Sequence, residues 1–308
     1  MDGFIVVDKP AGMTSHDVVS SVRRLAGMKK VGHTGTLDPF ATGVLPVALG
    51  EATKAIPFLD ESVKKYRAVM RLGETTDTQD CTGAVIRRGP WHEVTAGRIE
   101  ETVRLFLGRG SQVPPMYSAL KRDGVPLYRL ARRGEEVHRE PREIDIVSLV
   151  IDRIDLPDVT FTVSCSRGVY VRTLASDIGD RLGCGAHLVE LRRSASGPFS
   201  LEQAVTLERV AEVTGRRELP GLLISCHAAL AHLRDLPVTE QGAVRIARGI
   251  APEPTDLEAV PAEMLRQGER VRLSRRGTLL AVMESTTDGW PATGEKPRLL
   301  RVFNEPAG

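Results

Sequence analysis

The sequence has few cysteines, few aromatic residues, almost no net charge and no long apolar run. Its four cysteines form neither a C-x-x-C pair nor a metal-ligand spacing with histidines, which predicts reduced thiols and no metal site. No apolar run approaches the roughly 18 residues that a membrane span needs, and the first residues do not resemble a signal peptide. We therefore expect a soluble, cytoplasmic protein without a membrane partner.

The composition sets limits on size and charge. The formal net charge is +2, so any basic surface for a nucleic acid has to be local. Hydrophobic residues make up 41% of the chain, which is enough for a packed core. With 308 residues, the chain can hold one large domain and a smaller second one.

One short stretch combines the features of a catalytic loop, and it reads Gly32-His33-Thr34-Gly35-Thr36-Leu37-Asp38-Pro39. Its two glycines permit turns that a Cβ would block, and Pro39 biases Asp38 toward an extended conformation. A carboxylate held between such a turn and a proline is well placed to be aimed at a substrate. An ordinary turn stabilised by Asp and Thr side chains fits the same spacing equally well.

The apolar pattern predicts strands and helices that follow one another along most of the chain. We expect strands over residues 4–7, 43–49, 64–72, 144–154 and 159–165, and helices over residues 14–26, 95–107 and 173–182. Thr14 followed by Asp17 resembles a capping box, Gly27 would stop the first helix, and the strand over residues 64–72 alternates in character after Tyr66. Tyr170 and Arg172 stand two residues apart on what we expect to be a short extended piece. In a strand, that spacing would put both side chains on one face.

The pattern of apolar and polar residues changes after Leu207. Residues up to about 231 have a helical pattern with turns at Gly215 and Gly221, and short strands are expected over residues 270–273, 278–283 and 299–303. This pattern predicts a small β-rich accessory domain of roughly 75 residues.

Two charged segments allow more than one interpretation. Residues 121–142 carry seven Lys or Arg against four Asp or Glu, with Tyr128 among them. Such a segment is usually a solvated helix face, and the alternative is a basic arm laid against phosphates. The second segment, residues 74–83, contains Asp77 and Asp80 but lacks the other ligands and the closing glutamate of an EF-hand, so we reject a calcium site.

Six motifs occur in order over roughly residues 4 to 200. They are Asp8-Lys9-Pro10-x-Gly12-Met13-Thr14-Ser15, Gly32-His33-Thr34-Gly35-Thr36-Leu37-Asp38-Pro39-x-Ala41-Thr42-Gly43, Lys65-Tyr66-Arg67, Gly73-x-x-Thr76-Asp77-Thr78, Pro114-Pro115-Met116-Tyr117-Ser118-Ala119-Leu120-Lys121 and Cys165-Ser166-x-Gly168-x-Tyr170-x-Arg172. Together they resemble the TruB family of tRNA pseudouridine synthases. Phe40 and Val169 stand where Leu and Thr are more usual in that family, beside the charged and aromatic motif residues.

The resemblance implies an α/β fold with two domains. Residues 1–231 would form a catalytic domain on a mixed, mostly antiparallel central sheet flanked by helices, with an RNA-binding thumb inserted at about residues 121–142. Residues 232–308 would form a PUA-like C-terminal domain. The implied reaction is the isomerisation of the T-loop uridine of tRNA (position 55) to pseudouridine. It breaks the N1–C1′ bond and rejoins the uracil through C5, without a cofactor or metal.

The resemblance also assigns three catalytic roles. Asp38 would be the catalytic aspartate, and it could attack C1′ or remove a proton from C2′. The uridine has to be flipped out of the RNA fold, and Tyr66 would stack on the uracil. The hydroxyl of Tyr66, with its high ordinary pKa, would be a reluctant base. Arg172 would pair with Asp38 and keep it ionised, a task that suits a bidentate guanidinium better than an ammonium.

Further residues are assigned to substrate binding by the same resemblance. His33 would fill the space that the flipped nucleotide leaves, or stack in the loop, and Tyr170 and Leu191 would line the base pocket. Ordinary core positions for His33 and Tyr66 are the structural alternative. Lys9 and Pro10 would support the loop from the N-terminal strand. The remaining substrate-binding candidates are Gly35, Thr36, Lys121, Arg132 and Arg133.

Two other classes of protein remain open. A nucleoside or glycoside hydrolase could use Asp38 at an anomeric carbon, but such enzymes usually pair two carboxylates, and no second one stands in a matching motif. The other class is a non-catalytic RNA-binding or RNA-folding module, or a guide-RNA-dependent relative of the dyskerin kind; those relatives lack the arm that follows Lys121. Nothing in the sequence requires a protein partner or more than a monomer.

Overall fold

The chain folds around one large sheet. The computed structural model describes residues 1–60, 62–292 and 295–303. The main strands follow the order β1-β3-β12-β4-β11-β10-β7, with β2 paired to β3 and β13 to β12. All of these pairs are antiparallel except β12 with β3, which is parallel. The mixed, mostly antiparallel sheet that the resemblance implies is therefore confirmed.

The strands of this sheet are β1 (Gly3–Lys9), β2 (Val31–His33), β3 (Thr42–Leu49), β4 (Lys64–Leu72), β7 (Gly108–Gln112), β10 (Arg142–Asp155), β11 (Asp158–Cys165), β12 (Ala186–Ser196) and β13 (Phe199–Ser200). The alternation expected in β4 is present, because its side chains are buried at every second position from Lys64 to Leu72. The buried face of β4 carries Tyr66, which brings this residue into the protein interior.

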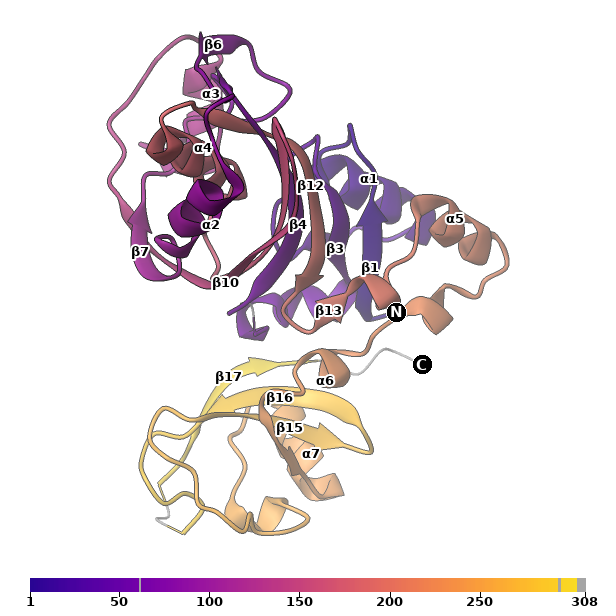
Figure 1. Cartoon of the computed structure of the whole chain (residues 1–308). Helices are drawn as coiled ribbons and strands as arrows, with labels where there is room; N and C mark the ends of the chain where they lie inside the picture. Colours follow the sequence, from indigo (N-terminus) through magenta and orange to yellow (C-terminus); the bar gives the residue numbers. More distant parts are fainter. Residues whose placement is uncertain (61, 293–294, 304–308) are drawn as a thin grey trace.

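Helices flank the sheet on both sides (Figure 1). The helices α2 (Ala96–Arg104) and α4 (Val171–Leu182) lie on one side, while α1 (Ser15–Ala26) and α5 (Leu207–Gly215) lie beside β1 and β3. Each side has its own apolar core. Residues of the first core include Met70, Phe161, Leu174 and Ile178, and residues of the second include Ile5, Val18, Leu45 and Val210.

The first helix shows how local sequence sets its own ends. Thr14 is the N-cap of α1, and its side chain accepts a hydrogen bond from the Asp17 amide while the Asp17 carboxylate accepts one from the Thr14 amide. Gly27 ends the helix in the left-handed conformation, with φ at 63°. The predicted capping box is confirmed, and it fixes the position of Ser15 at the start of the helix.

A second, four-stranded sheet follows in the C-terminal part, in the order β14-β15-β16-β17. Its elements are β14 (Arg234–Pro237), α7 (Glu240–Ala247), β15 (Arg270–Arg275), β16 (Thr278–Glu284) and β17 (Arg298–Val302). The three predicted strands are confirmed, whereas β14 and α7 were not expected. Helix α6 (Cys226–Ala229) leads into this sheet (Figure 1). The division at residue 232 stays a prediction, and residues 293–294 and 304–308 of the predicted C-terminal domain lie outside the described residues.

The two parts share apolar contacts. One buried cluster joins Phe4, Val44 and Phe199 of the large sheet with Leu279 and Val282 of β16. Such a shared cluster opposes free rotation of the C-terminal sheet against the larger part.

The segment before α4 differs from the prediction. Tyr170 is the N-cap of α4, and Arg172 is the second residue of that helix, which begins at Val171 and not at Thr173. The interpretation of Tyr170 and Arg172 as one face of an extended piece is therefore wrong. Extended and helical geometry both fit so short a stretch, and packing of α4 on the sheet favours the helix.

Residues 121–142 form a small irregular arm and not a long helix. The arm contains the hairpin strands β8 (Lys121–Arg122) and β9 (Val125–Pro126), followed by the short helix α3 (Leu127–Ala131). A separate hairpin of β5 (Glu74–Thr76) and β6 (Val85–Arg88) precedes it. The other short helices are η1 (Gly50–Lys54), η2 (Ile56–Phe58), η3 (Leu201–Gln203), η4 (Leu219–Leu222) and η5 (Pro254–Asp256).

Candidate active site

The Asp38 loop (residues 32–39) is held by the N-terminal segment of the chain. The Leu37 amide donates to Ser15 Oγ at 2.8 Å, and Ser15 Oγ donates to the Leu37 carbonyl at 3.2 Å. The ammonium of Lys9 donates to the Pro39 carbonyl at 3.1 Å. These bonds lie on both sides of Asp38, so they fix the backbone that carries the carboxylate.

Asp38 and Arg172 form a bidentate ion pair. Arg172 Nε donates to Asp38 Oδ2 at 2.7 Å, and Arg172 Nη2 donates to Asp38 Oδ1 at 3.2 Å. The Arg172 side chain is 3% exposed, whereas the Asp38 side chain is 30% exposed. The buried guanidinium therefore fixes the orientation of the carboxylate, and part of the carboxylate stays accessible to a ligand.

Arg172 connects Asp38 to two further segments. Its Nη1 donates to the Thr78 carbonyl at 2.7 Å, and its Nη2 donates to the Tyr117 carbonyl at 2.8 Å. Tyr117 lies at the base of the arm and Thr78 in the turn after β5. A single guanidinium thus joins the Asp38 loop, this turn and the arm's base.

Asp80 is a second carboxylate near the pair, and the sequence prediction assigned it no role. Its Oδ2 lies 3.5 Å from Arg172 Nη1, and its side chain is 6% exposed. Asp80 Oδ1 accepts hydrogen bonds from the Thr78 hydroxyl at 2.8 Å and the Thr82 amide at 2.9 Å. The signal available in the sequence was its place two residues beyond the Asp77-Thr78 motif, which we considered only as a calcium ligand.

The surroundings of Asp38 act on its pKa in opposite directions. Burial raises the pKa of Asp38 above its ordinary value, and the charge of Asp80 raises it further. The Arg172 guanidinium acts against both by charge and by hydrogen bonding. Asp38 is therefore a stronger proton acceptor than an ordinary aspartate, while its position stays fixed by Arg172.

Tyr66 forms a cluster with Asp38 and its partner Arg172. Its side chain is 7% exposed and belongs to the apolar core that also contains Leu37 and Ala41. Burial raises the pKa of the Tyr66 phenol and the charge of Asp38 adds to this rise, whereas the Arg193 guanidinium opposes it by charge and by hydrogen bonding. The hydroxyl is therefore held in its neutral form, which favours a stacking role over a role as general base.

Lys9 is fully buried beside the loop. Its ammonium donates to the carbonyls of Pro10 at 2.8 Å, Met13 at 2.6 Å and Pro39 at 3.1 Å. Burial lowers the pKa of Lys9 to about 8, although the charge of Asp38 raises it. Lys9 therefore joins the segment with Pro10 and Met13 to the end of the Asp38 loop, and Pro10 contributes one of the bonded carbonyls.

His33 stands at the end of β2, half-buried. Its Nδ1 is buried and has no hydrogen-bond partner among the described residues. Burial lowers the pKa of His33, and the neighbouring charge of Arg193 lowers it further. The imidazole is therefore neutral at neutral pH, with one ring nitrogen available for a new hydrogen bond.

Tyr170 and Leu191 border the same cluster. The Tyr170 backbone is fixed by Gln112, whose Oε1 accepts from the Tyr170 amide at 2.8 Å and whose Nε2 donates to the Tyr170 carbonyl at 3.2 Å. Burial raises the pKa of Tyr170, and the nearby charge of Asp38 adds to this rise. Leu191 is 6% exposed and belongs to the same apolar core as Tyr66.

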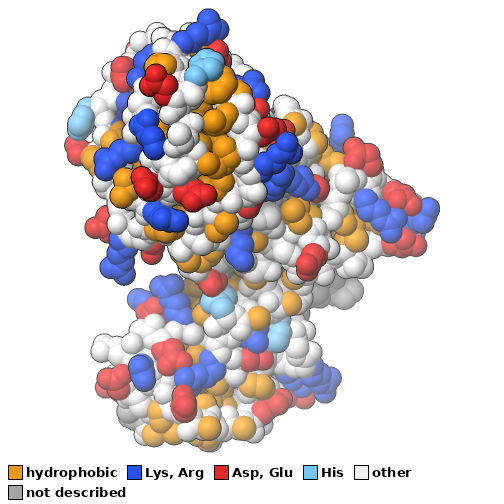
Figure 2. Space-filling view, viewed as in Figure 1, with side chains coloured by type: hydrophobic (Ala, Val, Ile, Leu, Met, Phe, Trp, Pro, Cys, Tyr) orange, Lys and Arg blue, Asp and Glu red, His pale blue; other side chains and the backbone are white. Residues whose placement is uncertain are grey.

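The other substrate-binding candidates lie apart from this cluster or at its edge. Gly35 is close to Lys64, because a Cβ added at Gly35 would lie 2.9 Å from Lys64 Nζ. Thr36 is exposed on the loop. Lys121, Arg132 and Arg133 are exposed on the arm. Figure 2 shows Lys and Arg side chains interspersed with Asp and Glu over the viewed face, in keeping with the small net charge.

The described residues provide neither a cluster of metal ligands nor a membrane-spanning helix. Among residues 1–60, 62–292 and 295–303, no group of three His, Cys, Asp or Glu side chains could hold a metal ion. In the same part of the chain, no helix is long and apolar enough to cross a membrane.

Two solved structures share the fold of this chain. A chain in the crystal structure of a Cbf5-Nop10-Gar1 complex superposes with a TM-score of 0.75 at 26% sequence identity, covering 98% of this chain and 84% of that one. A second structure, of an archaeal box H/ACA sRNP Nop10-Cbf5 complex, gives a TM-score of 0.73 at 26% identity and covers 98% of this chain and 86% of that one.

Sequence comparison identifies the family. Residues 23–171 match the N-terminal domain of TruB family pseudouridylate synthases, and residues 172–231 match the C-terminal domain of tRNA pseudouridylate synthase B. The chain is 60% identical to tRNA pseudouridine synthase B of Geotalea uraniireducens over 99% of this chain and 98% of that protein. It is 58% identical to the protein of the same name from Geobacter sulfurreducens, over 99% and 100% respectively. The chain belongs to the TruB family of pseudouridylate synthases.

Proposed function

We propose that this enzyme converts the T-loop uridine of tRNA, at position 55, to pseudouridine, with Asp38 as the catalytic carboxylate. The observation that carries the proposal is the Asp38–Arg172 ion pair, partly exposed and beside Tyr66, in a chain of this family. The name shared by relatives that are 58% and 60% identical supports tRNA as the substrate.

Asp38 has the properties that the reaction needs. In the isomerisation the N1–C1′ bond breaks and a C5–C1′ bond forms, while C5 loses a proton and N1 gains one. An ionised carboxylate close to the ribose can act at C1′ or C2′. The raised pKa of Asp38 strengthens it as a nucleophile or base, and the Arg172 fork holds its oxygens in one plane.

The aromatic residues would hold the flipped base. Tyr66 offers a buried ring next to Asp38, and stacking on an aromatic ring stabilises an unstacked base by about 1–3 kcal/mol. Tyr170 and Leu191 would complete the walls of the base pocket. His33 would fill the space that the nucleotide leaves, with its neutral ring and its unpartnered Nδ1.

The alternative of a hydrolase needs a second carboxylate that can activate water. Asp80 is the nearest candidate, but it is 6% exposed and its oxygens already face Arg172, Thr78 and Thr82. Asp80 therefore offers no free oxygen that could activate a water molecule, and its surroundings favour isomerisation over hydrolysis.

The arm would contact the T-stem. Its exposed Lys121, Arg132 and Arg133 can bind phosphates. Arg172 donates to the Tyr117 carbonyl at the arm's base, so arm and catalytic carboxylate are joined through one residue. We further propose that the chain acts as a monomer, without a protein partner and in the cytoplasm, and that residues 232–308 form a PUA-like domain.

The proposal is tested with the purified full chain, an unmodified T-arm hairpin and no added cofactor. We expect pseudouridine at the T-loop uridine, no free uracil, and loss of product in Asp38→Asn with RNA binding retained. Asp77→Asn is a matched control, because Asp77 is an exposed aspartate in the turn near Thr78. Release of uracil would indicate a hydrolase, and unchanged product in Asp38→Asn would rule out the assigned carboxylate.

A further inference from the structure

Arg193 is a fully buried arginine that no role above requires. It lies on β12, in the centre of the large sheet, and its side chain is 0% exposed. Burying a guanidinium is costly unless its donors are satisfied. Its Nε donates to the Val44 carbonyl at 2.7 Å and its Nη2 donates to the Gly35 carbonyl at 3.2 Å.

The strand positions place Arg193 between the two halves of the active site. On one side Arg193 is the register partner of Tyr66 in β4, so the two side chains leave the sheet on the same face. On the other side it pairs with Gly43 in β3. A Cβ at Gly43 would lie 2.2 Å from the Arg193 carbonyl, so only glycine allows β3 to approach this closely.

The side chain of Arg193 then reaches the middle of the Asp38 loop. The Gly35 carbonyl that it binds is three residues before Asp38 in the sequence. The other anchors of the loop, Ser15 and Lys9, bond at Leu37 and Pro39. Arg193 is therefore the anchor of the segment before the carboxylate, on the side that faces Tyr66.

The surroundings of this anchor are buried and polar. Within the described part of the chain, Arg193 Nη1, His33 Nδ1 and Thr34 Oγ1 are buried without a hydrogen bond of good geometry, and the Arg193 guanidinium lies close enough to the Tyr66 phenol to act on its pKa. A fully buried guanidinium at such a place indicates a demand beyond packing, because taking this charge out of water is costly. Leu or Met would fill the same volume without that cost.

We propose that Arg193 is a positioning residue, which holds the Asp38 loop and Tyr66 in the relative geometry that the reaction needs without touching the substrate. The proposal rests on the proposed function. Its neighbour Arg192 provides a matched control, because alternation along β12 sends that side chain to the opposite face. There Arg192 binds Asp8 at 2.7 and 3.0 Å and is 43% exposed.

The experiment compares Arg193→Met, Arg193→Lys and Arg192→Met with the unaltered chain on the T-arm hairpin. For each we would measure the single-turnover rate, the Kd for RNA and the thermal unfolding temperature. We expect Arg193→Met to lower the single-turnover rate by at least tenfold with the Kd within about twofold, because a small displacement of a catalytic group is costly. Arg193→Lys should restore part of the rate, since an ammonium can still bind the Gly35 carbonyl. Arg192→Met should keep the rate.

Each outcome decides the proposal. Equal rates in Arg193→Met and Arg192→Met would overturn it, and so would a loss confined to the Kd. If Arg193→Met does not fold, Arg193→Lys decides: a slow but stably folded lysine variant supports positioning, while an unchanged rate or a failure to fold makes Arg193 a purely structural residue. If the unaltered chain forms no pseudouridine, the proposed function itself has failed.

Discussion

The Asp38 site and the arm differ in how firmly the protein holds their charged groups. At the site, Arg172 makes four hydrogen bonds, to Asp38, Thr78 and Tyr117, and its side chain is 3% exposed. On the arm, Arg132 and Arg133 are exposed, and their contacts are a cation–π contact with Tyr128 at 5.6 Å and an ion pair with Glu135 at 4.0 Å.

The difference corresponds to two functions, catalysis and phosphate binding. Chemistry at a ribose requires a carboxylate fixed to within a fraction of an ångström, and buried bidentate bonds provide that fixation. Phosphate binding along a stem requires charge within reach but tolerates movement, since Coulomb attraction varies gently with distance. We therefore expect large, geometry-dependent effects at the site and small, salt-dependent effects on the arm.

The largest effect is expected for Arg172→Met. It leaves the carboxylates of Asp38 and Asp80 without their shared cation, and breaking such a buried pair costs about 3–5 kcal/mol. We expect a matching fall in the free energy of unfolding by denaturant, and a loss of rate on the order of 10²-fold or more. Arg172→Lys should fall between this variant and the unaltered chain. A stable, active Arg172→Met chain would contradict the view that this arginine fixes the site.

Asp38→Asn should separate activity from stability at the same ion pair. Because the pKa of Asp38 is raised in the folded chain, the folded state binds this proton more tightly than the unfolded state does. The ionised form therefore lowers stability above that pKa, and the penalty disappears as the pH falls through it. We expect Asp38→Asn to lose activity while its unfolding temperature at pH 7 equals or exceeds that of the unaltered chain, because Arg172 keeps Asp80 and the Thr78 and Tyr117 carbonyls as partners. A clear drop in that temperature would contradict the prediction.

Asp80→Asn should shift the pH dependence of the reaction. The charge of Asp80 raises the pKa of Asp38, so its removal should lower that pKa. The single-turnover rate falls on the acid side as Asp38 gains a proton, and we expect this limb to move to lower pH in the variant. Asn keeps the Oδ1 acceptor for Thr78 and Thr82. Asp77→Asn is the control and should leave the limb in place.

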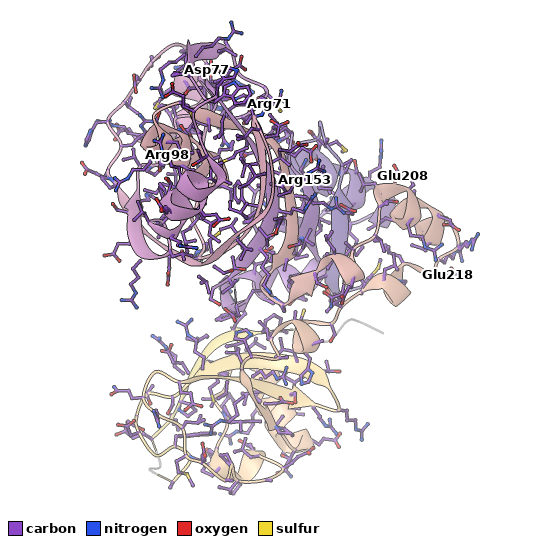
Figure 3. All side chains as sticks on the ribbon, in the orientation of Figure 1. Arg71, Asp77, Arg98, Arg153, Glu208 and Glu218 are labelled. Carbon is purple, nitrogen blue, oxygen red and sulfur yellow. The ribbon has the colours of Figure 1, made fainter. Side chains whose placement is uncertain are left out.

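The smallest effect is expected for the double variant Arg132→Ala with Arg133→Ala. Loss of two phosphate-binding charges should weaken RNA binding by about tenfold at moderate salt and reduce the slope of log K against log salt by about one per charge. The single-turnover rate at saturating RNA should not change. Arg209→Ala with Arg216→Ala removes one exposed arginine from α5 and one from its C-cap, in the region where Glu208 and Glu218 are labelled in Figure 3, and should leave binding unchanged. Equal weakening in both pairs would show a general charge effect and not an arm.

The comparison also explains where prediction from sequence succeeded. The capping box at Thr14, the alternation of β4 and the glycine that ends α1 are local features, and local geometry is enough to predict them. The segment at Arg172 was predicted incorrectly, because two residues carry no period and the start of α4 depends on its packing against the sheet.

The sequence by itself determined the order of the motifs, the aspartate between a glycine turn and a proline, and the strand that carries Tyr66, because each depends on neighbours in the chain. The pairing of Arg172 with Asp38 was implied by the family resemblance, but only the tertiary structure decided that Asp80 would share this arginine and that Arg193 would be enclosed beneath the loop. Those groups are separated by up to 158 positions, as between Gly35 and Arg193. Contacts at such separations are set by which strands pair and which faces are buried, and no local pattern in the sequence encodes them.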